Sequence, residues 1–228
     1  MRATVPQGDP DMTTTPGDSP SYTTHELYAL SGPFTRDSSR GGPGAVFGFP
    51  GPDPDPALYA AGLSTLTLRK KLVLDSGARR VDPETAVIAR LFTTSTGWLR
   101  LLIATDGGQQ AARIGTGPEG HVIFTQERTG THTVDLLAAT GDLSDDLTQI
   151  LDAVIRPVAD RGEAVLLASF HDASGERLSN LRIAPGVITL AGAPVGMDGR
   201  LSEVTLEGPE VAGRAMATRL LGTAPPAP

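Results

Sequence analysis

Apolar residues recur in strand-like runs through a long stretch in the middle of the chain. This stretch contains four such runs, at 99–105, 111–115, 121–125 and 134–137. Gly-rich segments separate them, beginning with Asp106-Gly107-Gly108. Aliphatic and β-branched runs that are cut by such segments predict antiparallel strands joined by hairpins. The stretch therefore predicts a four-stranded β-meander.

A helix is expected directly after this meander. Its apolar residues recur at spacings of three and four, which form one stripe on a helix: Leu143, Leu147, Ile150, Leu151, Val154 and Val158. Asp142 or Ser144 is the expected N-cap, and Asp145 and Asp146 lie where the helix dipole favours negative charge. We expect this helix to contribute to the core rather than to contact a partner.

The same pattern occurs a second time further along the chain. Its apolar runs lie at 164–169, 180–183, 186–189 and 204–206, and a helical run ends at Leu220-Leu221. Pairing Leu102 with Leu166 gives an offset of about 64 residues, and pairing Val134 with Val204 gives about 70. The predicted fold class is α+β: two quasi-repeated antiparallel β-meander plus helix units packed as one body.

Helices are also expected before the first meander. Thr23 followed by Glu26 is a capping-box pattern and predicts a short helix at about 24–30, which Gly32-Pro33 ends. Apolar spacing predicts helices at 57–74, with the alternative of a strand at its end, and at 84–92 after the N-cap and proline of Asp82-Pro83.

Composition divides the chain into units and tails. Residues 1–21 are polar and rich in Pro and Gly, so we expect a disordered tail there. The first unit spans 22–160 and includes a Gly/Pro-rich segment at 32–56, for which we predict a loop, with a short edge strand at 46–49 as the alternative. The second unit spans 161–222, and 223–228 form a frayed tail.

Charge and cysteine content narrow the classes of function. The chain has 26 acidic and 19 basic residues, a net charge of −7, and no cysteine. An acidic balance argues against general binding of nucleic acid or of anionic membranes. Without cysteine there is no disulfide and no thiolate site, and no apolar run reaches the length of a membrane span. We expect a soluble cytoplasmic protein.

The apparent catalytic motifs have simpler interpretations. Gly115–Gly120 matches the letters of a dinucleotide-binding loop, but the strand-like run His121-Val122-Ile123-Phe124 follows it instead of a helix, so we interpret it as a hairpin turn. The adjacent Ser169, His171 and Asp172 lack the arrangement of a hydrolase triad. We expect no enzyme activity and no cofactor.

Histidines show no metal-binding pattern either. No pair among His25, His121, His132 and His171 has the spacing of a helical metal site, so we interpret them as surface or strand-end residues and expect no metal.

One basic cluster keeps a DNA-binding alternative open. Arg69-Lys70-Lys71 and Arg79-Arg80 lie within the segment 57–92, where helices could present them to DNA. Cations at a helix C-terminus are also favoured by the helix dipole, and no second basic cluster supports the hypothesis. A DNA-binding regulator and an interaction protein of unknown partner remain the alternatives to the interpretation that follows.

Several of these segments together resemble the EspG family, the ESX (type VII) secretion-associated chaperones of actinobacteria. The resemblance covers roughly residues 22–222. Its features are the Thr23-Thr24-His25-Glu26-Leu27 helix start, Leu58-Tyr59-Ala60-Ala61-Gly62-Leu63-Ser64-Thr65-Leu66, Val81-Asp82-Pro83-Glu84, Ile103-Ala104-Thr105-Asp106-Gly107-Gly108, Ala111-Ala112-Arg113-Ile114 and the helix after Asp142.

The resemblance implies a binding protein without catalysis. Members of the family bind PE–PPE-type secretion substrates in the cytoplasm, and cover the apolar tip of the substrate until export. Their fold has two quasi-symmetric halves of antiparallel sheet with helices. Loops at 106–110, 116–120 and 191–201 would present polar contacts around such a tip. We expect partner contacts from Trp98, Gln109, Gln110, Glu119, His121, Met197 and Arg200.

Two of these expectations have alternatives. Trp98 is the only tryptophan and stands at the start of a strand, so core packing competes with a role as an interface anchor. Edge strands of either meander would be able to pair between subunits, which leaves a homo-oligomer open.

Overall fold

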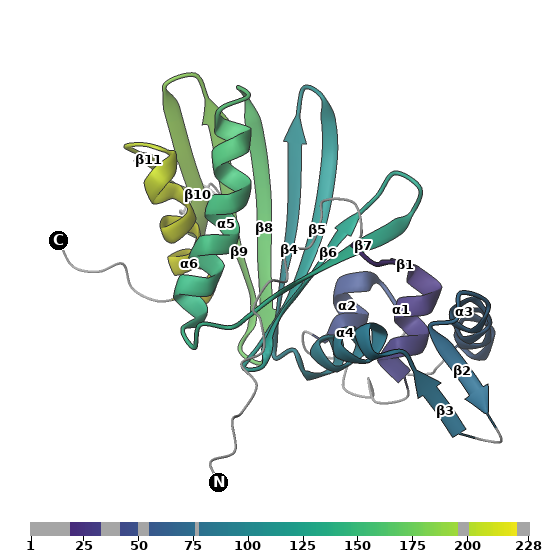
Figure 1. Ribbon diagram of the computed structural model, residues 1–228. Helices are drawn as coiled ribbons and strands as arrows, with labels where there is room; N and C mark the ends of the chain where they lie inside the picture. Colours follow the sequence, from purple (N-terminus) through teal and green to yellow (C-terminus); the bar gives the residue numbers. More distant parts are fainter. Residues whose placement is uncertain (1–18, 33–41, 50–54, 76–77, 196–200, 223–228) are drawn as a thin grey trace, which may run out of the picture.

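A computed structural model describes residues 19–32, 42–49, 55–75, 78–195 and 201–222. Within these ranges nine strands form one antiparallel sheet in the order β1-β7-β6-β5-β4-β8-β9-β10-β11 (Figure 1). The strands are β1 (Ser21–Thr23), β4 (Gly97–Thr105), β5 (Gly108–Gly117), β6 (Gly120–Gln126), β7 (Thr131–Leu137), β8 (Ala164–Asp172), β9 (Gly175–Ala184), β10 (Val187–Val195) and β11 (Leu201–Leu206).

Seven further elements of the described ranges are helices, and two more strands form a separate hairpin. The helices are α1 (Thr24–Ser31), α2 (Pro43–Phe47), α3 (Pro56–Leu68), α4 (Pro83–Thr94), α5 (Leu143–Ala159), the 3₁₀ helix η3 (Pro209–Val211) and α6 (Ala212–Leu221). The hairpin pairs β2 (Leu72–Asp75) with β3 (Ala78–Val81).

The predicted duplication is present, and the two units meet in the middle of the sheet. Strands β4 and β8, which open the two meanders, pair antiparallel with Leu101 opposite Ala168. Strands β4, β5 and β6 begin at 97, 108 and 120, and β8, β9 and β10 begin at 164, 175 and 187, so each counterpart starts 67 residues later. The offset of about 64 expected from Leu102 and Leu166 was therefore wrong by three residues.

The hairpin turns explain why both meanders form. Gly108 and Gly175 follow the first turn of each unit and have φ of +130° and +120°. Residues other than glycine rarely adopt this conformation. The segment Gly115–Gly120 also joins two strands, with Gly117 paired to Gly120, so its interpretation as a hairpin turn is confirmed.

The helices cover opposite faces of the sheet. Successive side chains of a strand point to opposite faces. Trp98 packs with α1, α2 and α4, whereas the next residue, Leu99, packs with α5 and α6. We call these the N-helix face and the C-helix face. In Figure 1, α5 and α6 lie side by side over the β8–β10 part of the sheet, and the N-terminal helices gather at the β1–β7 end.

Aromatic rings form the core of the N-helix face. Phe47 lies 5.2 Å from Phe124, 5.4 Å from Phe92 and 5.8 Å from Trp98 between ring centroids. The edge-to-face geometry of these pairs is the arrangement that the ring quadrupole favours. Trp98 has no exposed surface, so core packing is what the structure shows for this residue.

The helix caps that the sequence predicts at Thr23 and Asp142 are present in the structure. Thr23 Oγ1 accepts from the Glu26 backbone N–H, and the Glu26 carboxylate accepts from the Thr23 N–H, so the capping box is confirmed. Asp142 caps α5 through the N–H groups of Ser144 and Asp145, and Gly222 ends α6.

Three local predictions were wrong. The loop predicted at 32–56 contains α2, which begins with Pro43 at its first turn and is held by the buried Phe47. The helix predicted at 57–74 ends at Leu68, because Lys70 has φ of +58° and the chain turns into β2. The tail predicted at 1–21 ends earlier, since Ser21 pairs with Thr133 in the sheet. Residues 1–18 and the tail predicted at 223–228 lie outside the described residues.

Candidate binding site

An apolar groove runs along α5 on the C-helix face. It has a volume of about 590 Å³ and lies between α5 and strands β4, β5 and β6. Its lining is mostly aliphatic: Leu101, Ile103, Gln110, Ala112, Ile114, His121, Ile123, Thr125, Leu137, Ala138, Asp146, Gln149, Ile150, Ala153, Val154, Pro157, Val158 and Arg161. Concave apolar surface with a few polar groups is the usual composition of a binding site.

The placement of α5 creates the groove. Leu147, Leu151 and Ile155 of α5 are fully buried in the core, which also contains β8 and β9. On the next side of the helix, Ala153 is exposed and Val154 is half-buried beside the strands of the first unit. The apolar stripe predicted for this helix is therefore mainly core, as expected, and one edge of it forms a wall of the groove.

The floor of the groove has residues that the sequence analysis missed. Ala112 of β5 and Ile123 of β6 are half-buried on the C-helix face, where α5 does not cover them. The alternation of apolar residues in these strands was visible. The position of α5 across the sheet decides which residues of these strands remain exposed to a partner. No local sequence pattern predicts that position.

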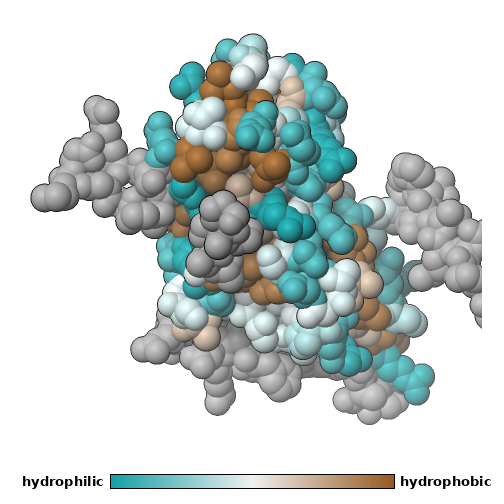
Figure 2. Space-filling view, turned by 90° about the vertical axis from the view of Figure 1, so that its left-hand side faces the viewer, coloured by the Kyte–Doolittle hydropathy of each residue, from teal (hydrophilic) through white to brown (hydrophobic). Residues whose placement is uncertain are grey.

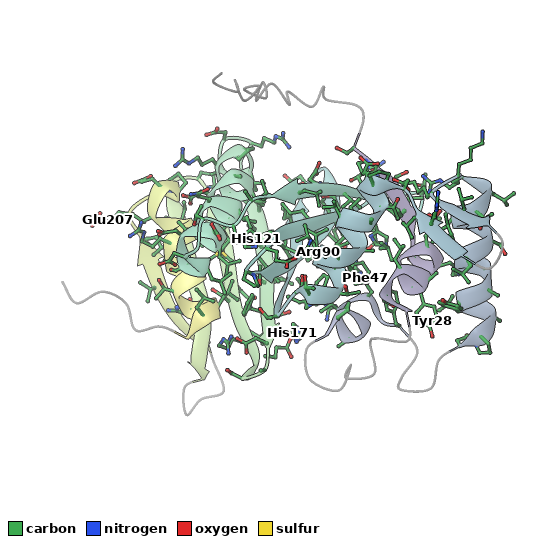
Figure 3. All side chains as sticks on the ribbon, turned by 60° about the horizontal axis from the view of Figure 1, so that its bottom comes forward. Tyr28, Phe47, Arg90, His121, His171 and Glu207 are labelled. Atoms are coloured by element: carbon green, nitrogen blue, oxygen red, sulfur yellow. The ribbon has the colours of Figure 1, made fainter. Side chains whose placement is uncertain are left out.

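A buried hydrogen bond between His121 and Asp146 closes one end of the groove. His121 Nε2 lies 2.7 Å from Asp146 Oδ2, and the two side chains are 2% and 5% exposed. The Asp146 carboxylate also accepts from the backbone N–H and the hydroxyl of Thr140. Figure 3 shows His121 in the middle of the molecule, away from His171.

This environment sets the protonation of Asp146. Burial alone would raise the pKa of Asp146, but hydrogen bonds from Thr140 and His121 outweigh burial and lower the pKa below its usual value. The carboxylate is therefore charged at neutral pH and fixes the orientation of the imidazole. His121 and His132 each stand one residue inside the start of a strand, as expected, but the expected surface position was wrong, because both are buried and His132 lies 5.5 Å from Phe47 between ring centroids.

Two of the predicted contact residues share the groove. Gln110 and His121 lie toward opposite ends of its lining, since Ala111 pairs with Gln126 and Thr116 pairs with His121 across β5 and β6. Six residues of strand span about 20 Å, which is the approximate length of the groove. Gln109 is exposed next to Gln110 but is not part of the lining.

The other predicted contact residues lie elsewhere. Glu119 is in the β5–β6 turn, where its carboxylate lies 2.6 Å from Arg90 of α4. Trp98 is fully buried in the aromatic core and presents no surface to a partner in this conformation. Met197 and Arg200 lie outside the described residues.

Side chains at Ser169 and His171 do meet, because alternate residues of a strand share a face. Ser169 Oγ lies 3.1 Å from His171 Nε2, and the same nitrogen lies 3.2 Å from Glu176. A catalytic relay needs the acid on the other ring nitrogen. Asp172 points to the opposite face and binds Arg177. The arrangement therefore lacks the geometry of a hydrolase triad.

Two basic side chains of the cluster Arg69-Lys70-Lys71 make contacts within the protein. Arg69 lies 2.8 Å from the fully buried Glu26, and Lys71 lies 3.5 Å from the centre of the Tyr22 ring. Both also donate to the carbonyl of Ser21. Two of the cations that the DNA-binding hypothesis needs are thus held against the N-terminal helix and strand.

Neither a metal centre nor a membrane span is found in the described part of the chain. There, no three His, Asp or Glu side chains gather closely enough to hold a metal ion. Among the described helices, none has the length and apolar character required to cross a membrane.

Comparison with known proteins finds likeness in structure alone. No protein-family model matches the chain, and no curated protein matches it by sequence. A solved structure of the Mycobacterium tuberculosis type VII secretion system chaperone EspG5, in complex with the PE25-PPE41 dimer, matches with a TM-score of 0.52. The match covers 92% of this chain and 98% of EspG5 at 10% identity. The chain therefore has a fold similar to that of the chaperone EspG5.

Proposed function

We propose that this protein is a cytoplasmic chaperone or adaptor of a type VII (ESX) secretion system in an actinobacterium, and that it binds PE–PPE-type substrates without catalysing a reaction. The apolar groove beside α5 is the observation that carries the proposal. The likeness in fold to EspG5 supports it, since the match spans nearly the whole of both chains.

The groove suits an apolar tip of a helical partner. An α-helix with its side chains is about 10–12 Å wide, and the groove is about 20 Å long. Ile123, Ala112 and Val154 would supply apolar contact in its centre, and the exposed Gln110 would supply a polar group at one end. Covering exposed apolar surface on a partner keeps that partner from aggregating, which is the physical task of such a chaperone.

The groove requires no cofactor for this role. Binding would come from apolar area removed from water, which contributes about 25 cal/mol per Å² before the costs of association. Polar groups at the rim would select the partner by leaving unsuitable side chains unpaired.

The test is binding of the PE–PPE dimers that the source genome encodes. The purified full chain is mixed with each co-expressed dimer, and complex formation is measured by size-exclusion chromatography and calorimetry. We expect a stoichiometric complex with at least one dimer. A source genome without PE and PPE proteins, or dimers that all fail to bind, would overturn the proposal.

A groove variant locates the interaction. Ala153 is exposed on α5 and lines the groove, so Ala153→Arg adds bulk and charge to the groove without disturbing the core. We expect it to weaken binding at least tenfold. The matched control is Ala60→Arg on α3, an exposed helical alanine outside the groove, which we expect to bind normally. Equal binding by both variants would place the partner elsewhere.

A further inference from the structure

The N-helix face of the second unit exposes apolar side chains that no described helix covers. Val165 and Leu167 of β8 and Leu178 of β9 point to this face, because they alternate with core residues and Ser169 pairs with Leu178. Their exposed fractions are 40%, 44% and 49%. On the first unit, the same face of the sheet carries α1, α2 and α4. No described helix packs in the corresponding place on the second unit.

The uncovered surface continues onto the first unit as a shallow hollow. The hollow has a volume of about 420 Å³, and its lining includes Leu102, Ala111, Leu167, Leu178, Asn180 and Arg100. It lies on the opposite side of the sheet from the groove beside α5. Figure 2 shows the β11 side of the molecule, where apolar surface lies among polar residues.

Positive charge is concentrated around the hollow. Arg100 lies directly opposite Arg113 across β4 and β5, and like charges in this position destabilise a sheet. Arg113 donates to the Val46 carbonyl and to Gln126. Arg100 and Arg182 are exposed, and neither has a hydrogen bond or an ion pair with any described residue.

These cations contrast with the rest of the chain. The whole protein has a net charge of −7, so a face with unpaired arginines around leucines is a local exception. On the strands of the sheet, two carboxylates point to this face: Glu176, which pairs with His171, and Glu203, which lies on the edge strand β11. Neither neutralises Arg100.

We propose that this surface, the arginine–leucine patch (Arg100, Leu102, Val165, Leu167, Leu178 and Arg182), docks an acidic amphipathic helix of a protein partner. Leucine or valine side chains of the partner fill the hollow, and its carboxylates pair with the two free arginines. The patch is independent of the groove beside α5, so the two surfaces hold two different segments.

The spacing of the arginines specifies the partner further. Arg100 pairs with Ser169, and Arg182 pairs with Val165, so the two lie two strands and four residues apart. Strand spacing converts this to about 10 Å across the sheet and about 13 Å along it, or about 16 Å in all. On a helix that rises 1.5 Å per residue, carboxylates about eleven residues apart match this distance.

Charge argues against two other occupants. A second copy stacked face to face would bring the two sets of arginines together and repel. An anionic membrane would attract the patch but repel a chain of net charge −7. A short acidic helix brings only a few carboxylates, which contact the arginines directly, so the net charge of the chain opposes it less than it opposes an extended anionic surface.

The test uses two synthetic helical peptides with the full chain. Both carry the same leucine stripe, and at two positions eleven residues apart one carries Glu and the other Lys. Fluorescence anisotropy at low salt measures their affinities, and methyl NMR locates the contact. We expect the Glu peptide to bind at least tenfold more tightly, to lose affinity with added NaCl, and to shift the methyl signals of Leu167 and Leu178.

Variants of exposed arginines make the test specific. Arg100→Glu combined with Arg182→Glu should reverse the preference between the two peptides. The matched control Arg214→Glu lies on the exposed side of α6 and should leave it unchanged. Ala153→Arg should also leave it unchanged, which separates this surface from the proposed chaperone function.

Four results would overturn the proposal. The first is equal binding of the two peptides, and the second is a methyl shift at Ile123 of the groove instead of at the patch. The third is tighter binding of the protein to vesicles with anionic lipid than to the Glu peptide. The fourth is a dimer in solution that Arg100→Glu dissociates.

Discussion

Replacing Asp146 with alanine is expected to destabilise the protein by about 3–5 kcal/mol. The carboxylate accepts from His121 at 2.7 Å and from the Thr140 hydroxyl and backbone N–H at 2.6 and 3.1 Å. A hydrogen bond to a charged group contributes about 1.5–3 kcal/mol, and the variant removes the bonds to two residues, His121 and Thr140. The second ring nitrogen of His121 already lacks a hydrogen-bond partner among the described residues, so the variant would leave both nitrogens unpaired.

Urea unfolding measures this loss. Trp98 is the only tryptophan and is fully buried, so its fluorescence reports the loss of the packed core. With a urea dependence of about 1–3 kcal/mol per M, the midpoint should fall by at least about 1 M. The control is Asp145→Ala, which removes an exposed carboxylate from the same helix turn and should cost less than about 1 kcal/mol.

The same pair predicts a pH dependence in acid. The pKa of Asp146 is lower in the folded protein than its usual value, so its contribution is complete above the unfolded pKa of about 3.9 and is lost as pH falls below it. Asp146→Ala should therefore lose less stability than the parent protein on acidification. A midpoint for Asp146→Ala within about 0.3 M urea of the parent at pH 7 would refute the reasoning.

Two further predictions test the packing. Gly62→Ala should destabilise the contact of α3 with α1, because the added Cβ would lie 2.0 Å from the His25 carbonyl oxygen. Calorimetry should show a melting temperature that is lower by several degrees. The control Gly107→Ala, whose Cβ would have its nearest contact at 3.7 Å, should melt at the temperature of the parent protein. Burial and the nearby Arg113 lower the pKa of His132 to about 4, so its NMR signals should not titrate between pH 5 and 8. The contribution of the neutral His132 to stability should be lost as pH falls from about 6.5 toward 4. Titration of the His132 signals near pH 6.5 would contradict the burial of its ring.

Local signals in the sequence predicted the elements well. Caps at Thr23 and Asp142, the glycines after the hairpin turns and the apolar stripe of α5 depend on residues a few positions apart, which a sequence shows directly. Helix α2 was missed because its five residues have weak local signals, and Phe47 holds it through contacts with distant rings.

Long-range pairing limited the prediction of the site. His121 is buried because Asp146, 25 residues away, reaches it from α5. Ser21 joins the sheet because it pairs with Thr133 across more than a hundred residues. Gln110 was predicted as a contact and does line the groove, but Ile123 and Ala153 were missed, since their exposure follows from the position of α5 on the sheet.

Site-specific photocrosslinking tests the proposed groove most directly. A photoreactive amino acid replaces Gln149, which is exposed and lines the groove, or Ala60 on α3 in a separate variant. Each variant is mixed with a PE–PPE dimer that binds the parent chain, irradiated and analysed by mass spectrometry. The groove predicts a cross-link to the PE–PPE dimer from position 149 and none from position 60. A complex that forms but cross-links from position 60 and not from 149 would contradict it.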